Sequence, residues 1–205
     1  LRVPTYSKWL ESRDQRPAYR YMRRVLQLLQ WQRGASRWVL KTPHHLEWLD
    51  VLIETFPGAM VIQTHRDSRK TMASFCSMIA HGRGVFSDAI DPHEIGIHWL
   101  HKVKRLVDRS MDFRNSESAK AGRFLDVHYP RLLEDLMAEL RRVYDFFDLE
   151  LRPEALSAMR ETMSRDRQHR YGRHHYELSD FGLSLADLDR AFGRYQDFYG
   201  IEREG

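Results

Sequence analysis

The sequence predicts an α/β fold in which helices flank a parallel sheet. Candidate strands at residues 38–40, 60–66 and 124–128 each begin with apolar residues, and each is followed by a segment whose apolar residues recur at helical spacing. A buried parallel strand is typically a continuous apolar run, and a parallel pair needs a crossover connection between its strands. We therefore expect three strands in one sheet that helices bury on both faces.

The first predicted helix runs from Pro17 to Gly34. Proline is favoured at the first helical position and glycine just past the last one. Apolar residues at helical spacing predict that one face of this helix is buried. These residues are Tyr21, Val25, Leu28 and Leu29. The residues before Pro17 predict an irregular lead-in.

Two strand-to-helix connections follow in series. Thr42 and Pro43 come directly after the first apolar run and predict a helix N-cap and a first helical residue. Asp67 or Ser68 has the same place after the second run. The inward residues of these two helices are predicted to be Leu46, Leu49, Ile53 and Phe56 in the first, and Met72, Phe75, Cys76 and Ile79 in the second.

The second half of the chain predicts one more strand and three more helices. A long amphipathic helix precedes the strand at residues 124–128. A further helix begins at Pro130 and continues to Phe147, and Ser184 caps the last one. Between these two helices lies a segment rich in Arg and His, residues 160–175.

Composition and charge narrow the range of partners. The 205 residues include 33 Lys and Arg against 29 Asp and Glu, a net charge of +4. This excess suits an acidic ligand but is too small for a surface that coats nucleic acid, so no nucleic-acid partner is expected. Cys76 is the only cysteine, which excludes an internal disulfide. No apolar stretch is long enough to span a membrane, and we expect a cytoplasmic protein.

Several polar residues follow the predicted strands, where open α/β sheets bind their ligands. They are Lys41, His44, His45, Arg66 and Tyr129. Ser74 lies eight residues after Arg66, about two helical turns further on. A guanidinium and a hydroxyl beside the positive end of a helix suit a phosphate. Taken singly, each residue favours a structural role, in which Arg66 pairs with Asp67 or another surface acid and Ser74 bonds to its own helix.

His44 and His45 are predicted to lie in the first turn of a helix, where the helix dipole disfavours an imidazolium. A neutral imidazole there can act as a general base. Lys41 is placed to stabilise charge on a leaving-group oxygen. Since adjacent histidines point in different directions, at most one is expected to be catalytic, and each of the three residues can also be an ordinary exposed side chain.

The basic segment at residues 160–175 can fold over an anion as a flap, or it can be a solvated surface loop. Its histidines lack the spacing of metal ligands, and no metal site is expected. Neither G-x-x-x-x-G-K-[ST] nor G-x-G-x-x-G occurs in the chain. The usual backbone cradle for the 5′ phosphates of a nucleotide is therefore missing.

The order of these motifs resembles that of the sulfotransferases that use 3′-phosphoadenylyl sulfate (PAPS), the bacterial branch above all. The matching segments are LKTPHH at 40–45, FPGA at 56–59, THRD at 64–67 with Ser74, VHY at 127–129, GRHHY at 172–176 and DFGL at 180–183. The resemblance covers nearly the whole chain. It implies the P-loop nucleotide-kinase-like fold and a single domain over residues 1–205 whose amino-terminal part, with the phosphosulfate-binding loop, is missing.

The resemblance also implies roles for individual residues. Arg66 and Ser74 correspond to the residues that bind the 3′ phosphate of the donor, and Tyr129 to a residue near the adenine. Arg170, Gly172 and Arg173 correspond to a basic loop that closes on the same phosphate. Many family members have a catalytic histidine two residues after the lysine, where this chain has Pro43. The base therefore stays open between His44, His45 and a group outside the sequence.

The expected reaction is in-line transfer of a sulfuryl group from PAPS to a hydroxyl or amine of a small molecule, without a metal ion. His44 or His45 removes the acceptor proton, and Lys41 stabilises the departing phosphate oxygen of adenosine 3′,5′-bisphosphate (PAP). Two alternatives stay open. One is a non-catalytic nucleotide- or RNA-binding module that uses residues 160–175. The other is a kinase-like phosphotransferase, which needs a Walker loop and a magnesium ligand.

Overall fold

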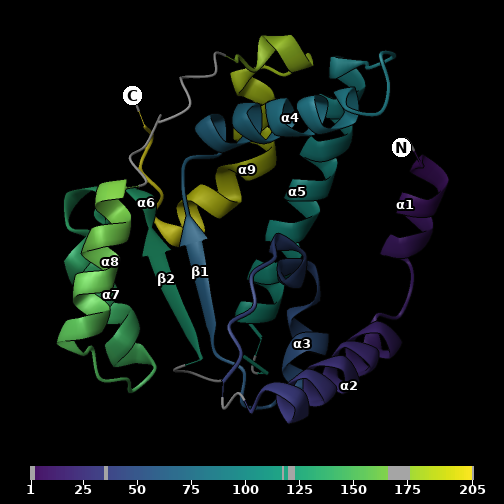
Figure 1. Ribbon diagram of the computed structural model, residues 1–205. Helices are drawn as coiled ribbons and strands as arrows, with labels where there is room; N and C mark the ends of the chain where they lie inside the picture. The colour runs from purple at the N-terminus through teal and green to yellow at the C-terminus, as the bar shows by residue number, and fades with distance from the viewer. Residues whose placement is uncertain (1–2, 35–36, 117, 120–122, 166–175, 205) are drawn as a thin grey trace.

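The computed structural model confirms an α/β fold with helices around a parallel sheet (Figure 1). Two strands form the sheet in the described part of the chain: β1 (Val61–His65) pairs in parallel with β2 (Phe124–His128). The chain passes from one strand to the other through α4 (Ser68–Gly84) and α5 (Pro92–Arg114). The described residues are 3–34, 37–116, 118–119, 123–165 and 176–204.

Of the three predicted strands, the first along the chain, at residues 38–40, does not form. Val39 is 91% exposed and Leu40 is 46% exposed. A strand exists only when a neighbour accepts its backbone hydrogen bonds, and β1 and β2 pair with each other rather than with this segment. The apolar run correctly marks a segment before a helix, but it contains no information about whether a pairing partner is available.

The two faces of the sheet are covered unequally. Helices α5 and α9 (Leu185–Tyr199) cover the face of β1 on which Gln63 and His65 are buried. Ile62, on the opposite face, is 39% exposed. The expected burial on both faces is thus only partly met in the described residues. The covered face is polar, and this polar layer lies directly beneath the candidate site.

The amino-terminal helices differ from expectation in one respect each. Residues of the predicted irregular lead-in form α1 (Pro4–Glu11). Helix α2 (Arg16–Arg33) ends as predicted, because Gly34 adopts the left-handed conformation with φ 63° that suits glycine. Its buried residue is Tyr19, however, while Tyr21 is 69% exposed, so the inward face is not the predicted one.

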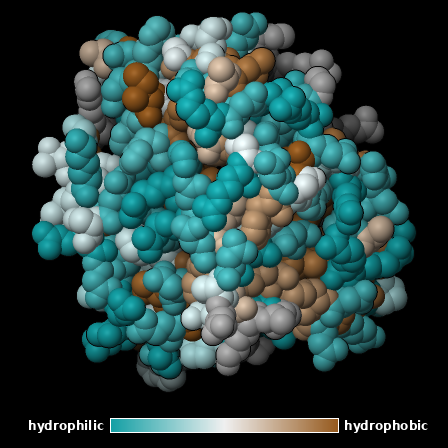
Figure 2. Space-filling model, turned by 180° about the vertical axis from the view of Figure 1, so that it is seen from behind, coloured by the Kyte–Doolittle hydropathy of each residue, from teal (hydrophilic) through white to brown (hydrophobic). Residues whose placement is uncertain are grey.

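The error on α2 has a simple cause, since the helix carries apolar residues on two faces. Trp31 is 81% exposed, and it is one of several large apolar side chains on the molecular surface. Seen from behind, that surface is mainly hydrophilic, with apolar residues gathered in its central and lower part (Figure 2). Helical spacing identifies an apolar stripe but does not tell which of two stripes meets the core.

The predicted helix after Thr42 is divided into a 3₁₀ helix, η1 (Pro43–Trp48), and α3 (Leu49–Thr55). The predicted helix from Pro130 to Phe147 is likewise two helices, α6 (Tyr129–Glu134) and α7 (Leu136–Phe146). The break lies at Asp135, whose φ of −148° and ψ of 85° leave the helical region. Its carboxylate then accepts from the Ala138 backbone N–H and caps α7.

Helix α8 (Pro153–Arg165) includes the start of the segment rich in Arg and His, for which a flap or loop was predicted. Helices α6, α7 and α8 lie beside β2, and α4, α5 and α9 lie on the other side of the strands (Figure 1). The main core is between α4, α5 and α9. Its most deeply buried members are Met72, Cys76, Ile95, Met111, Leu188 and Phe192.

Gly96 lies where two segments of this core approach each other closely. A Cβ at this position of α5 would lie 2.0 Å from the carbonyl oxygen of Phe181, in the short 3₁₀ helix η2 (Ser179–Phe181). No real pair of atoms tolerates that distance, so the two segments must separate if a methyl group is added. Gly193 on α9 is a useful contrast, because an added Cβ meets no heavy atom within 4 Å.

We expect Gly96→Ala to lower the free energy of unfolding by about 1–3 kcal/mol, since overpacking displaces η2. The loss should occur even though alanine is the better helix former. Gly193→Ala should raise the same quantity by about 0.5–1 kcal/mol. Urea denaturation of both variants measures the two effects, and equal stability of the variants would contradict the close contact.

Candidate anion-binding site

The site is formed where the two strands end. His65 and His128 are opposite each other as the last pair of the parallel ladder, so the next residues, Arg66 and Tyr129, leave the sheet side by side. The Arg66 guanidinium carbon lies 4.0 Å from the centre of the Tyr129 ring. At this distance a cation and an aromatic face attract each other. Two of the predicted site residues are therefore brought together at the carboxyl edge of the sheet.

Arg66 already holds an anionic group. Its Nε donates to Oε1 of Glu204 at 2.8 Å, and its Nη2 donates to Oε2 at 2.8 Å. This two-point geometry is how a guanidinium binds a carboxylate or two oxygens of a phosphate. The hydrogen bond from Arg66 is the main cause that lowers the pKa of Glu204, and the same bond raises the pKa of Arg66.

The residue after Arg66 fixes the turn into α4. Asp67 is 1% exposed, and its carboxylate accepts from the backbone N–H groups of Arg69, at 2.9 Å, and Glu204, at 3.0 Å. Asp67 is therefore the N-cap of α4, one of the two caps that the sequence predicted. Ser74 lies in the second turn of this helix and is partly buried. A phosphate shared by Arg66 and Ser74 stays a prediction.

Lys41, His44 and His45 lie together at the start of η1. The Thr42 side chain caps this 3₁₀ helix by accepting from the backbone N–H of His44 at 3.4 Å. Lys41 and His44 are exposed, whereas His45 is half-buried with its Nδ1 2.8 Å from the Tyr19 hydroxyl. Burial, and then the neighbouring His44, lower the pKa of His45. The two histidines thus have different surroundings, and burial favours the neutral form of His45.

Three further predictions concern the basic loop, a metal site and a membrane-spanning helix. Arg170, Gly172 and Arg173 of the expected basic loop lie outside the described residues. Among the described residues, no three His, Cys, Asp or Glu side chains gather in a way that could hold a metal ion. No helix in that same part of the chain is both long and apolar enough to cross a membrane.

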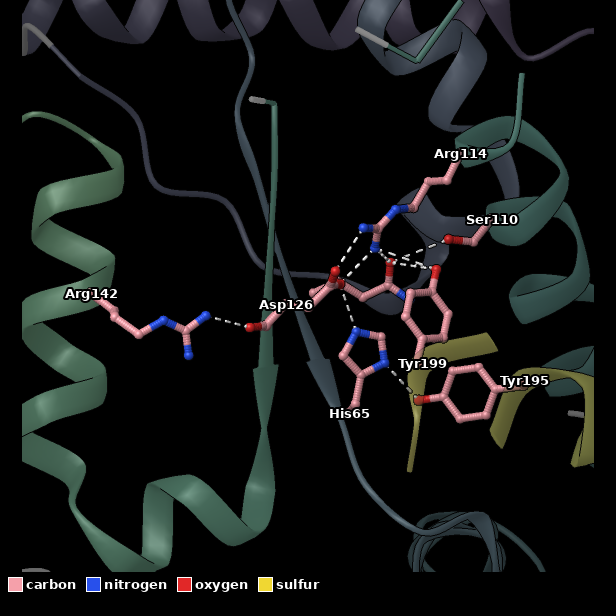
Figure 3. Close-up of polar contacts among 8 residues, drawn as sticks. His65, Ser110, Arg114, Asp126, Arg142, Tyr195 and Tyr199 are labelled. Carbon is pink, nitrogen blue, oxygen red and sulfur yellow. Dashed lines mark hydrogen bonds and ion pairs between the residues drawn. The ribbon is translucent and has the colours of Figure 1, made fainter. Parts of the chain in front are cut away.

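A largely buried polar cluster lies on the covered face of the strands, with the Asp126 carboxylate at its centre (Figure 3). Asp126 accepts from Nε2 of His65 at 2.8 Å and from the two Nη atoms of Arg114 at 2.6 and 2.7 Å. Its backbone carbonyl accepts from Arg142 of α7 at 2.9 Å. We call the following residues the Asp126 cluster: Gln63, His65, Ser110, Arg114, Asp126, Tyr195 and Tyr199.

The electrostatics of the cluster are dominated by the pair of Asp126 and Arg114. Burial acts to raise the pKa of Asp126, but hydrogen bonds from Arg114 and then His65 outweigh it and hold the pKa far below its ordinary value. The carboxylate is therefore charged. Gln63 completes the arrangement by accepting from Arg114 at 3.0 Å and from Ser110 at 3.3 Å.

The sequence did not identify the Asp126 cluster, although it contains one sign of it. Asp126 is a charged residue in the middle of the strand FLDVH, and Gln63 is a polar residue in VIQTH. A carboxylate in a covered strand needs a cation or several hydrogen-bond donors. Which of the many arginines supplies the charge depends on tertiary structure.

These features define an α/β protein with an anion-binding arginine at the carboxyl edge of a parallel sheet. A comparison with models of protein families matches residues 3–153 to the sulfotransferase family. The match covers more than half of the chain, and the chain belongs to this family. No curated protein sequence matches the chain.

Two solved structures are similar. The sulfotransferase STF9 from Mycobacterium avium is 31% identical with a TM-score of 0.88, and the match covers 100% of this chain and 52% of that one. The sulfotransferase STF1 from Mycobacterium tuberculosis H37Rv is 34% identical with a TM-score of 0.78, over 94% of this chain and 49% of that one. The chain therefore has the sulfotransferase fold of bacterial relatives and spans about half of their length.

The charge on Asp126 predicts a pH-dependent stability. The folded-state pKa is lowered, so the ionised carboxylate stabilises the fold above the unfolded pKa of about 3.9, and this contribution is lost as the pH falls through the folded-state pKa. We expect Asp126→Asn to lower the free energy of unfolding at neutral pH by about 1.5–3 kcal/mol. The difference from the wild type should shrink below about pH 4.

Urea denaturation across this pH range measures the effect. Asp112→Asn is a matched control, because Asp112 is 63% exposed in its ion pair with Arg194. It should change stability by less than about 1 kcal/mol. A loss in Asp126→Asn that is equally large at acid pH would show that the carboxylate charge does not contribute.

Proposed function

We propose that the protein is a cytoplasmic sulfotransferase that uses PAPS as its donor, and that this chain supplies the 3′-phosphate end of the donor site. Family membership supports a transferase of sulfuryl groups. The observation that carries the proposal is the guanidinium of Arg66, which lies against Tyr129 and binds a carboxylate at two points. The same pair of N–H donors matches two oxygens of a phosphate.

In this proposal Glu204 occupies the place of the 3′ phosphate until the donor binds. A phosphate monoester has a charge of about −1.5 to −2 near neutral pH, compared with −1 for a carboxylate, and can displace it. The backbone N–H of Glu204 bonds separately to Asp67. The side chain can therefore turn away from Arg66 while the backbone keeps its anchor.

The other donor contacts follow from the family resemblance. Ser74 adds a hydroxyl to the phosphate, and Tyr129 lies next to the adenine. Arg170, Gly172 and Arg173 close over the nucleotide. Since the solved relatives are about twice as long, we further propose that the 5′-phosphosulfate end is bound by residues that precede this sequence in the intact protein.

The proposed chemistry is in-line displacement at sulfur. A hydroxyl or amine of a small-molecule acceptor attacks the sulfur atom as the bond from sulfur to the 5′-phosphate oxygen breaks. His44 or His45 takes the acceptor proton, and His45 is already biased toward the neutral form that this requires. Lys41 stabilises the negative charge on the oxygen of the departing PAP. The scheme uses side-chain charges and needs no metal ion.

The first test concerns the anion bound by Arg66. Arg66→Ala should weaken PAP binding by about 10- to 150-fold, the equivalent of a charge-assisted hydrogen bond of about 1.5–3 kcal/mol. Glu204→Gln should strengthen PAP binding, because it removes the competing negative charge. Titration calorimetry of the intact protein measures both affinities.

Arg190→Ala is the control for a general effect of charge, because this arginine is 77% exposed and its partner is Asp187. It should leave PAP binding nearly unchanged. If Arg66→Ala binds PAP as tightly as the wild type, the 3′-phosphate role of Arg66 is wrong.

The second test concerns catalysis in the intact protein, followed by transfer of labelled sulfate from PAPS to hydroxyl and amine acceptors. Lys41→Ala should lower kcat while the affinity for PAP changes little. Of His44→Ala and His45→Ala, one should lower kcat by about 10²–10⁴-fold, the usual contribution of a general base.

Two outcomes would favour other functions. Binding of oligonucleotides that weakens steeply with salt, without sulfate transfer, would indicate an RNA-binding module. Magnesium-dependent transfer of the γ-phosphate of ATP would indicate a phosphotransferase.

A further inference from the structure

The strand end before Arg66 is held by a residue far away in the sequence. The ladder of β1 ends at His65, so Arg66 lies just beyond the last strand pair. Nδ1 of His65 lies 3.0 Å from the hydroxyl oxygen of Tyr195 on α9, within hydrogen-bond distance. Tyr195 is 8% exposed, and burial raises its pKa. A buried hydroxyl thus contacts the last residue of β1 that pairs with β2.

The hydrogen bonds continue from His65 toward the interior. Nε2 of His65 donates to Asp126 at 2.8 Å, because an ionised carboxylate can only accept. In the tautomer with its proton on Nε2, Nδ1 accepts from the Tyr195 hydroxyl. The chain of bonds therefore runs from Tyr195 through His65 and ends at the charged pair of Asp126 and Arg114.

The surroundings leave His65 and Tyr195 little freedom. His65 is 1% exposed, and its ring centre lies 4.1 Å from that of Tyr199 (Figure 3). Gln196, the residue after Tyr195, has its Nε2 3.4 Å from a carboxylate oxygen of Asp67. Arg66 is therefore flanked by two anchors to α9, one at the preceding residue, His65, and one at the next residue, Asp67.

We propose that Tyr195, oriented by His65 and Asp126, is a positioning residue for the arginine that binds the 3′ phosphate. It fixes the direction in which the Arg66 side chain leaves the backbone. A two-point bond to phosphate tolerates little angular error, and a fixed backbone reduces the freedom that a long side chain loses on binding. This inference rests on the proposed function of Arg66.

The test compares two nucleotides on the intact protein by calorimetry. PAP has a 3′ phosphate and adenosine 5′-monophosphate (AMP) does not. Tyr195→Phe removes the hydroxyl and keeps the ring. We expect it to weaken PAP binding by about 3- to 10-fold, the effect of one hydrogen bond, and to leave AMP binding unchanged. A general loss of folded protein would weaken both nucleotides equally, so the ratio of the two affinities reports on positioning.

Tyr199→Phe is the matched control. It makes the same change on the same helix and in the same cluster. The Tyr199 hydroxyl, however, bonds to Gln63 and Arg114, whereas the Tyr195 hydroxyl bonds to His65. The ratio of PAP affinity to AMP affinity in Tyr199→Phe should equal that of the wild type. His65→Gln should lower the ratio as Tyr195→Phe does, and the double variant should show no further loss, because the two residues act in series.

The outcomes separate the two proposals. If the wild type binds PAP and AMP with equal affinity, the proposed function of Arg66 is wrong. If the wild type prefers PAP and Tyr195→Phe keeps the full preference, only the positioning role is wrong. The same is true if Tyr199→Phe loses as much preference as Tyr195→Phe, since the effect then belongs to the packing of the whole cluster.

Discussion

The charged pair of Asp126 and Arg114 joins the two strands to α5 and α7 beside the edge of the sheet that carries Arg66. Asp126 belongs to β2, Arg114 ends α5, and His65 bonds to the same carboxylate from β1. Arg142 adds α7 through the backbone carbonyl of Asp126. A partly buried carboxylate that lost these donors would be costly, so the elements that supply them must stay together. The orientation of the sheet edge, and of Arg66 above it, depends on this one interaction.

Helix α9 connects this interior pair with the surface. Tyr195 and Tyr199 of this helix belong to the Asp126 cluster. Asp189, on the same helix, pairs with Arg69 of α4 at 2.6 Å. The family match ends at residue 153, whereas the similarity to STF9 covers the whole chain. The groups that hold the best-defined residue of the site thus come from a segment outside the family match. A site assignment from that match alone would include Arg66 and omit its support.

Local signals in the sequence predicted the features that depend on a few neighbouring residues. Gly34 ends α2, Asp67 caps α4, and Ser184 opens α9 in a capping box with Asp187. The position of Arg66 and Tyr129 at the sheet edge was predicted because position after a parallel strand is itself a local property.

The sequence failed where a remote partner decides the outcome. Residues 38–40 have no strand to pair with in the described structure, and α2 offers two apolar faces of which one meets the core. Asp126 and His65 are 61 residues apart, and His65 and Tyr195 are 130 apart. No spacing rule relates such positions, so the Asp126 cluster could be recognised only in three dimensions.

The pairing of Arg66 with Glu204 has a consequence for ligand discrimination. A nucleotide without a 3′ phosphate has nothing to exchange for the carboxylate, so it meets an arginine whose charge is already neutralised. A nucleotide with that phosphate replaces one anion by a stronger one. Its apparent affinity equals its intrinsic affinity multiplied by the fraction of molecules in which the pair of Arg66 and Glu204 is open. For the function proposed for this chain, Glu204 is thus an internal competitor that screens out weak anions before the donor arrives.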